Sequence, residues 1–321
     1  MAFDSKYLWL DGKFIPFEDA KLHFLTSSFH YGTSVFEGIR SYSTPNGPAI
    51  FRLKDHLDRL IKSAKILGFE ELPYTFDEIY DATLELVKMN GMEECYIRPL
   101  VYIKEGGWNL SVINIKIDMG IAVWKWTNYL GENALHSGVR ANVSSFPRHH
   151  LNIMMTKGKI SGNYVNSVMA KSESLRGGFD EAIMLDPNGN VSECTGENIF
   201  IVRDNIIYTT PRNSVLEGLT RDSIMTIAAD LGYIIKEEVI TRDQLYISDE
   251  VFVTGTAAEV IALSEIDYRK IGTGKTGPVC AILQKAYSDV IHGLNKKYEG
   301  WIDYIYLESG KEILNRRSVL G

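Results

Sequence analysis

The sequence has few cysteines, and their arrangement excludes the usual metal and disulfide frameworks. Only Cys95, Cys194 and Cys280 occur in 321 residues, and none belongs to a C-x-x-C pair. An odd number of widely spaced cysteines argues against a disulfide scaffold or a zinc knuckle and is typical of a reducing cytosol. The seven histidines form no H-E-x-x-H motif, so we expect no metal site.

Long apolar runs and an excess of positive charge are also missing. No apolar stretch reaches the ~18 residues that a membrane span needs. The first residues include Asp4 and Asp11 and lack the apolar core of a signal peptide. With 34 Lys+Arg and 41 Asp+Glu the net charge is -7, which disfavours general nucleic-acid binding because acidic surfaces repel phosphates. We therefore expect a cytoplasmic globular protein, long enough for two domains.

Helical and β-type patterns are both present, without strict alternation. Apolar spacing and capping residues predict helices over 53–67, 75–91, 164–176, 220–231 and 278–294. Strand patterns lie at 7–17, 34–43, 49–53, 94–103, 112–126, 140–145, 181–186, 198–204, 205–210, 233–240 and 250–256. This mixture predicts an α/β (mixed α+β) fold. The polar residues 127–137 predict a linker between a small domain, 1–126, and a larger one, 138–321.

Three kinds of segment in the second half could carry chemistry. Residues 155–164 place two lysines before a helix, and residues 191–198 place two glutamates around a glycine. The turns at 217–222 and 254–259 offer free backbone amides that can hold a phosphate. Separately these are a solvated lysine, a turn carboxylate and a helix cap. Together they match what pyridoxal phosphate requires, namely an amine, a carboxylate and phosphate-holding turns, although spacing alone does not separate this interpretation from coincidence.

The same segments resemble the branched-chain amino-acid aminotransferases, which are fold-type-IV pyridoxal-phosphate enzymes with the D-amino-acid aminotransferase-like fold. The resemblance extends over nearly the whole chain, in order. The matching runs are FHYGTSVFEGIR (29–40), YIRPL (96–100), KISGNY (159–164), SECTGENIF (192–200), LEGLTRD (216–222), DEVFVTGTAAE (249–259) and GPVC (277–280).

The resemblance implies a role for each matching cofactor residue. Lys159 takes the place of the catalytic lysine that binds the cofactor aldehyde covalently, whereas Lys157 does not fit that offset. Glu193 matches the residue that pairs with the pyridine nitrogen, and Tyr164 the one that hydrogen-bonds the ring hydroxyl. The remaining cofactor contacts, to the phosphate and the ring face, fall on Arg59, Leu216, Leu219, Thr220 and Thr256.

Substrate contacts are implied in the same way. Tyr96, with the amides of Thr256 and Ala257, resembles the site for the α-carboxylate, and Arg98 the site for the side-chain carboxylate of glutamate. The apolar pocket is assigned to Tyr31, Phe36, Trp126, Tyr129 and Tyr164. The loop at 104–112, KEGGWNLSV, departs from the family pattern, with no proline and an added tryptophan.

The function implied is transamination of leucine, isoleucine and valine with 2-oxoglutarate, by a homo-oligomer of at least two subunits. A D-amino-acid or (R)-amine transaminase is an alternative within the fold, but Phe36, Gly38 and Arg40 with Tyr96 and Arg98 resemble the L-branched-chain group more closely. Another is 4-amino-4-deoxychorismate lyase, whose bulky cyclic diacid suits an apolar aromatic pocket poorly. A third is a binding protein without turnover, which would be expected to have lost the lysine or the glutamate.

Overall fold

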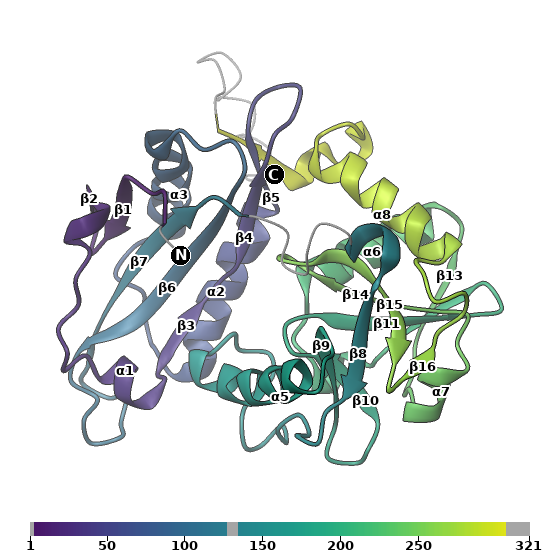
Figure 1. Ribbon diagram of the computed structural model, residues 1–321. Coiled ribbons are helices and arrows are strands. Elements are labelled where there is room, and N and C mark those ends of the chain that lie inside the picture. The colour runs from purple at the N-terminus through teal and green to yellow at the C-terminus, as the bar shows by residue number, and fades with distance from the viewer. Residues whose placement is uncertain (1–2, 127–133, 306–321) are drawn as a thin grey trace.

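The computed structural model describes residues 3–126 and 134–305. Within them the strands form two sheets that lie in separate halves of the molecule, with helices around and between them (Figure 1). The mixed α/β class predicted from the sequence is confirmed.

The first sheet is built mainly from the N-terminal part of the chain. Its strands are β1 (Tyr7–Leu10), β2 (Lys13–Pro16), β3 (Ser34–Phe36), β4 (Ile39–Tyr42), β5 (Ala49–Phe51), β6 (Cys95–Glu105), β7 (Lys116–Trp124) and β17 (Ile302–Tyr304). They run in the order β17-β5-β4-β6-β7-β1-β2, with β3 also paired to β6. The last of these strands in the sequence, β17, pairs antiparallel with β5, so a segment from near residue 300 completes one edge of the sheet.

The second sheet is built from the later part of the chain. Its strands are β8 (Val139–Val143), β9 (Glu181–Leu185), β10 (Val191–Cys194), β11 (Asn198–Arg203), β12 (Ile206–Thr209), β13 (Ile234–Glu237), β14 (Glu250–Gly255), β15 (Glu259–Ile266) and β16 (Arg269–Lys270). The order is β10-β9-β8-β15-β14-β11-β12-β13, and parallel pairs (β8 with β9, β8 with β15, β12 with β13) occur among antiparallel ones.

The helices cover the sheets. They are α1 (Ser27–Tyr31), α2 (Leu53–Leu67), α3 (Phe76–Asn90), α4 (Ala134–Ser137), α5 (Tyr164–Arg176), α6 (Leu219–Asp230), α7 (Arg242–Tyr246) and α8 (Pro278–Ile291), with 3₁₀ turns η1 (Phe17–Asp19), η2 (Ser161–Asn163), η3 (Arg212–Ser214) and η4 (Lys296–Trp301). Helices α2 and α3 bury their apolar faces against the first sheet, and α6 and α8 pack on the second. None of the helices in the described ranges combines the length and apolar character that crossing a bilayer demands.

Helix α2 matters for the site because two of its faces are buried. Leu57 and Leu60 pack into the core of the first sheet. On another face, His56 and Ser63 are buried although they are polar. A helix that is buried on a polar face must supply hydrogen-bond partners there, and this face is directed at the cavity described below.

The structure departs from the sequence prediction at several elements. Strands β10 and β15 were not predicted, because β10 reads as a loop and the buried run Val260–Leu263 in β15 has no alternation that separates strand from helix. The proposed linker, 127–137, falls partly outside the described residues, and residues 134–137 form α4. Helix α5 is confirmed, but its apolar residues Val165 and Val168 are exposed, whereas Ser167, Ala170 and Ser174 are buried.

Candidate active site

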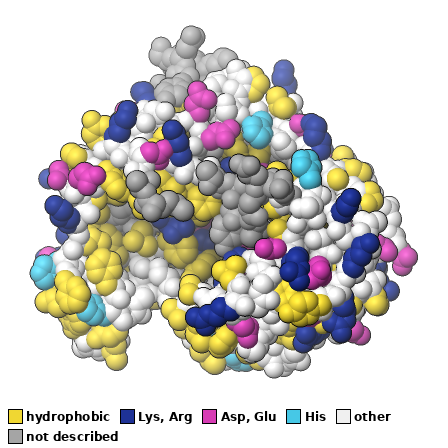
Figure 2. Space-filling model, viewed as in Figure 1, with side chains coloured by type: hydrophobic (Ala, Val, Ile, Leu, Met, Phe, Trp, Pro, Cys, Tyr) yellow, Lys and Arg dark blue, Asp and Glu magenta, His cyan; other side chains and the backbone are white. Residues whose placement is uncertain are grey.

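A cavity lies between the two halves and is lined by residues of both. Its empty space, including the part open to solvent, is about 450 Å³. The space-filling view shows the molecule hollowed in this region, with apolar side chains along the hollow (Figure 2). The structure brings every residue expected to bind the cofactor to the walls of this cavity: Arg59, Lys159, Tyr164, Glu193, Leu216, Leu219, Thr220 and Thr256.

Lys159 is held by its backbone and presents its amine to the cavity. Its N–H donates to Ser63 Oγ on α2 at 2.9 Å, and its carbonyl accepts from Phe36 N–H at 3.1 Å. The Nζ atom donates to the Tyr164 hydroxyl at 2.8 Å and lies 5.1 Å from the centre of the Phe36 ring. Lys157, by contrast, pairs with Glu217 at 3.2 Å and does not line the cavity. Two segments more than 90 residues away therefore fix the position of Lys159.

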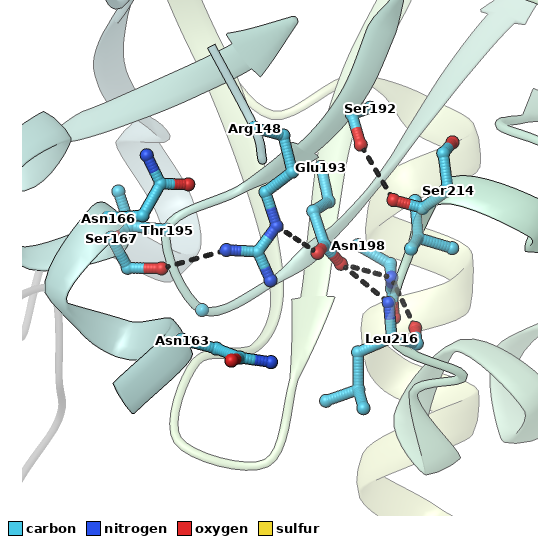
Figure 3. A network of polar contacts seen from close by, with 12 residues as sticks. Arg148, Asn163, Asn166, Ser167, Ser192, Glu193, Thr195, Asn198, Ser214 and Leu216 are labelled. Atoms are coloured by element: carbon cyan, nitrogen blue, oxygen red, sulfur yellow. Dashed lines mark hydrogen bonds and ion pairs between the residues drawn. The ribbon is translucent and has the colours of Figure 1, made fainter. Parts of the chain in front are cut away.

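Glu193 is a buried carboxylate that also lines the cavity. One oxygen, Oε1, lies 2.8 Å from Arg148 Nε. The other, Oε2, accepts from Leu216 N–H at 3.2 Å and from Asn198 Nδ2 at 3.3 Å. Figure 3 shows Arg148 on one side of the carboxylate and Asn198 with Leu216 on the other. Burial raises the pKa of Glu193, and Arg148 and the Leu216 amide oppose that rise.

Arg148 is a residue of the cavity wall that sequence reasoning missed. It lies in the segment after β8, is 7% exposed, and also donates to Ser167 Oγ on α5 at 3.3 Å. A buried carboxylate needs a cation or several hydrogen-bond donors close by, so a partner of this kind is expected next to Glu193. Nothing in the sequence around residue 148 identifies it, because the two residues are 45 positions apart.

Arg59 reaches the cavity from α2 and is oriented by a buried glutamate. Glu37 accepts from Arg59 Nε at 2.6 Å and from Nη2 at 2.9 Å, and its Oε2 lies 2.7 Å from His56 Nδ1. Burial alone would raise the pKa of Glu37, but Arg59 and His56 outweigh it and hold the pKa well below its usual range. A third guanidinium nitrogen, Nη1, donates to the carbonyl of Glu217 at 2.7 Å. Glu37 and His56 were not identified as site residues from the sequence.

The N-terminus of α6 opens into the same cavity. Its first residues, Leu219 and Thr220, follow the N-cap Gly218, and first-turn amides have no partners within their helix. Such a helix end attracts anions through its free N–H groups and its dipole. A side chain at Gly218 would not fit, because a Cβ there would lie 2.0 Å from Asn198 Oδ1. Together with Arg59, this end of the cavity offers donors that could hold a phosphate group.

The residues expected to bind substrate form an aromatic and cationic cluster beside Lys159. Tyr96 and Arg98 point to the same side of β6, where Arg98 Nη2 donates to the Tyr96 hydroxyl at 3.2 Å. The Arg98 guanidinium lies 4.6 Å from the centre of the Phe36 ring, and the rings of Tyr96 and Trp126 are 4.6 Å apart. No carboxylate in the described ranges is within ion-pair distance of Arg98, and its buried Nε has no partner there.

One of the expected pocket residues, Tyr31, is not part of this cluster. Tyr31 is 42% exposed and contacts His30 and Trp108 in an aromatic group at the surface of α1. Tyr129 lies outside the described residues. Ala257 follows Thr256 in the turn between β14 and β15 and is half-buried.

Comparison with known proteins agrees with this arrangement. The family model for amino-transferase class IV matches residues 34–266. The branched-chain-amino-acid aminotransferase of Pseudomonas aeruginosa is 48% identical over 301 residues, which are 94% of this chain and 98% of that protein. The enzyme of the same name from Escherichia coli K12 is 40% identical over 303 residues, with 94% and 98% covered.

Solved structures are similar over almost the whole chain. One is a branched-chain amino acid aminotransferase complexed with N-(5'-phosphopyridoxyl)-L-glutamate, with a TM-score of 0.91, 45% identity, and coverage of 95% of this chain and all of that one. Another is the Escherichia coli enzyme, with a TM-score of 0.92, 39% identity and coverage of 94% and 100%. The chain belongs to the class IV amino-transferase family, in the group of the branched-chain-amino-acid aminotransferases.

Proposed function

We propose that the protein transfers the amino group of leucine, isoleucine or valine to 2-oxoglutarate, using pyridoxal 5'-phosphate. The observation that carries this proposal is the combination in one cavity of Lys159, Glu193 and the N-terminus of α6, beside an apolar cluster that contains a single arginine without an acidic partner in the described ranges. The relatives named above, and the phosphopyridoxyl compound in one of them, support the same assignment.

The residues present fit each part of pyridoxal phosphate. Lys159 can bind its aldehyde, Tyr164 can hydrogen-bond the ring hydroxyl, and Glu193 can accept from the protonated ring nitrogen. Arg59 and the α6 amides suit the phosphate, and Leu216 can cover a ring face. When bound, the cofactor supplies an electrophilic carbon and an electron-withdrawing ring that makes the substrate Cα proton easier to remove.

Lys159 is assigned the proton transfer. With the cofactor and substrate held in the cavity, the Lys159 Nζ would be the base that takes the proton from the substrate Cα and the acid that gives it back. The Tyr164 hydroxyl, 2.8 Å from Nζ, orients the amine for both steps.

Glu193 is assigned the ring nitrogen, and Arg148 is assigned to keep Glu193 ionised. Burial favours the neutral carboxyl group, which would be a poorer partner for a protonated nitrogen. The Arg148 guanidinium at 2.8 Å opposes this and favours the negative charge that would hold a proton on the ring nitrogen.

Substrate recognition is divided between two ends of the aromatic cluster. Tyr96 with the amides of Thr256 and Ala257 would bind the α-carboxylate that all substrates share. Phe36 and Trp126 would contact the branched side chain, and Tyr129 would add to this surface, whereas Tyr31 lies at the surface of α1. Arg98 would meet the side-chain carboxylate of glutamate, because a carboxylate buried without a cation is costly.

The decisive experiment measures leucine transamination to 2-oxoglutarate and the visible absorbance of the lysine-linked cofactor in the wild type and in Lys159→Ala. We expect Lys159→Ala to lose both, because it removes the covalent link and the proton-transferring amine. Lys157→Ala is the matched control and should retain both. A yellow, active Lys159→Ala with an inactive Lys157→Ala would reject the assignment, and activity on D-leucine or (R)-amines in preference to L-leucine would favour the alternative transaminases.

We further propose that the protein is a cytoplasmic homodimer with two domains, 1–126 and 138–321, joined by residues 127–137. Exposed apolar residues on α1 and α5, among them Phe29, Tyr31 and Val168, support an interface between subunits. The return of β17 to the first sheet qualifies the division, because residues 302–304 then belong structurally with the first domain.

A further inference from the structure

Arg52 is a buried arginine in an unusual backbone conformation, close to the cavity but not lining it. It immediately precedes α2, with φ 53° and ψ 38°, in the left-handed region that non-glycine residues seldom adopt. Its N–H donates to the carbonyl of Trp301 at 2.6 Å, and its guanidinium lies 5.0 Å from the centre of the Trp301 ring. Such a conformation persists only where the surroundings fix it and is often found near functional sites.

The guanidinium of Arg52 crosses from the first half of the molecule to the first turn of α6. Its Nη1 lies 3.3 Å from the carbonyl oxygen of Leu219, 2.6 Å from Asp222 Oδ2 and 3.1 Å from Ser223 Oγ. Its Nε donates to Asp55 on α2 at 2.7 Å. One side chain therefore ties the start of α2 to the helix end that offers amides to a phosphate.

Arg52 acts together with Arg59 on the other side of the same turn. Arg59 lies two turns along α2 from Arg52, and both side chains reach the segment at the start of α6. Arg59 Nη1 donates to Glu217 O at 2.7 Å, before the N-cap Gly218, whereas Arg52 binds residues after it. The segment 217–223 is thus held on both sides, with the Leu219 and Thr220 amides between the two contacts.

The ion pair between Arg52 and Asp222 also favours a phosphate at the start of α6. Asp222 lies in the first turn of α6, where its carboxylate would repel a phosphate bound at the helix end. Its ion pair with Arg52 offsets this charge and fixes the side chain. Because the Asp222 side chain is about half exposed, solvent screens the charge, and the geometric role of Arg52 is the larger one.

We propose that Arg52 is a positioning residue for the cofactor phosphate: it holds the first turn of α6 so that the Leu219 and Thr220 amides meet the phosphate group. This rests on the phosphate site of the proposed function. Arg52 does not itself touch the phosphate, which distinguishes it from Arg59.

The test compares the affinity of the apoenzyme for pyridoxal phosphate with its affinity for pyridoxal, which lacks the phosphate. In Arg52→Gln the dissociation constant for pyridoxal phosphate should rise about tenfold, while that for pyridoxal should stay within about twofold. Lys62→Gln, on the same helix and with an exposed ion pair to Asp58, is the matched control and should change neither. Arg52→Lys keeps the charge but cannot contact Asp55, Asp222 and Leu219 O together, so we expect an intermediate ratio.

The proposal would be overturned if Arg52→Gln had the same ratio of the two dissociation constants as the wild type. An equal weakening of both affinities would indicate a general structural defect and not a loss of phosphate binding. If Arg52→Gln does not fold, Arg52→Lys decides, and a ratio equal to that of the wild type would again overturn the proposal. A wild-type protein that binds pyridoxal phosphate no better than pyridoxal would overturn the proposed phosphate site as well.

Discussion

In the proposed function, recognition of both leucine and glutamate depends on Arg98. Its guanidinium rests on the rings of Phe36 and Tyr96, at 4.6 and 5.2 Å from their centres, without an acidic partner in the described part of the chain. A cation held on aromatic faces in this way tolerates an apolar side chain nearby, yet can pair with a carboxylate when glutamate binds.

Arg98→Ala should therefore impair only one half-reaction. We expect single-turnover rates with glutamate or 2-oxoglutarate to fall by roughly 2–4 kcal/mol in transition-state stabilisation, which is ~30-fold or more, while the leucine half-reaction changes little. Stopped-flow measurements of each half-reaction check this. Equal losses for leucine and glutamate, with a lower melting temperature, would instead indicate that Arg98 is structural.

Glu197 is a second buried carboxyl group at the cavity, close to Glu181. Glu181 is fully buried and accepts from Lys171 Nζ at 2.5 Å and from the Thr195 hydroxyl at 2.5 Å. Glu197 accepts from the Gly196 N–H at 3.0 Å. Burial and then the Glu181 charge raise the pKa of Glu197 to about 8, and the group should be largely neutral at pH 7.

This shift predicts how the stability of the apoenzyme depends on pH. Between the unfolded pKa of 4.5 and about 8 the folded state holds a proton that the unfolded state lacks, so the contribution of Glu197 to stability falls as pH rises. Glu197→Gln removes this loss and should stabilise the apoenzyme at pH 9 by about 1–3 kcal/mol, with little effect at pH 4.

Urea unfolding at the two pH values measures this difference. Glu238→Gln, at an exposed position, is the control and should show no such pH dependence. If Glu197→Gln is no more stable than the wild type at pH 9, the carboxyl group is not neutral in the folded protein.

The residues that the sequence identified and those it missed differ in the range of their contacts. All the predicted cofactor residues line the cavity, and all except Arg59 lie within recognisable local runs such as KISGNY and LEGLTRD. Arg148, His56 and Arg52 act through partners 45, 19 and 170 residues away. Local patterns do not encode such partnerships, and Glu37 was inside a recognised run but had no assigned role.

At the scale of elements, the break between β3 and β4 allows a close approach of Tyr96, one of the residues proposed to bind substrate. Gly38 lies in this break, and a Cβ there would be 2.0 Å from the Tyr96 hydroxyl. Tyr96 cannot readily move away, because its ring is packed against Trp124 and Trp126, with centres 5.0 and 4.6 Å from its own. The glycine thus allows the Tyr96 hydroxyl to approach the backbone of the neighbouring strand.

Gly38→Ala should displace that hydroxyl and affect both half-reactions. We expect the KM values for leucine and for glutamate to rise together, and stability to fall by about 1–3 kcal/mol because of the overpacking. Gly300→Ala, where an added Cβ meets no atom within 4 Å, is the control. Unchanged KM values in Gly38→Ala would show that Tyr96 does not bind the shared carboxylate.

Helices were predicted correctly where the apolar periodicity and the capping residues agree. Helix α3 begins at the capping box of Thr75 and Glu78 and ends before Gly91, as predicted. Strand β15 was missed because its run Val260–Leu263 is buried without alternation. The apolar spacing in α5 located the helix but not its surroundings, since burial depends on what lies opposite and not on the helix itself.

For the whole molecule, the exposed face of α5 supports assembly into a dimer. Val165, Val168 and Met169 are 61%, 62% and 45% exposed, and neighbouring apolar residues of this kind on a globular protein commonly mark an interface. Replacing Val165 and Val168 together by lysine should convert a dimer to a monomer in sedimentation velocity. Ile282→Lys, on α8 and also partly exposed, is the control, and a doubly substituted protein that remains dimeric would place the interface elsewhere.

The pairing of β17 with β5 also determines when the first sheet can be finished during synthesis. Ile50 pairs with Asp303, about 250 positions later, so one side of β5 has no strand partner until most of the chain has been made. An unpaired strand edge can recruit the wrong partner, and contacts between distant segments form slowly. During synthesis, the β5 edge of the first sheet therefore stays unpaired until β17 has been made.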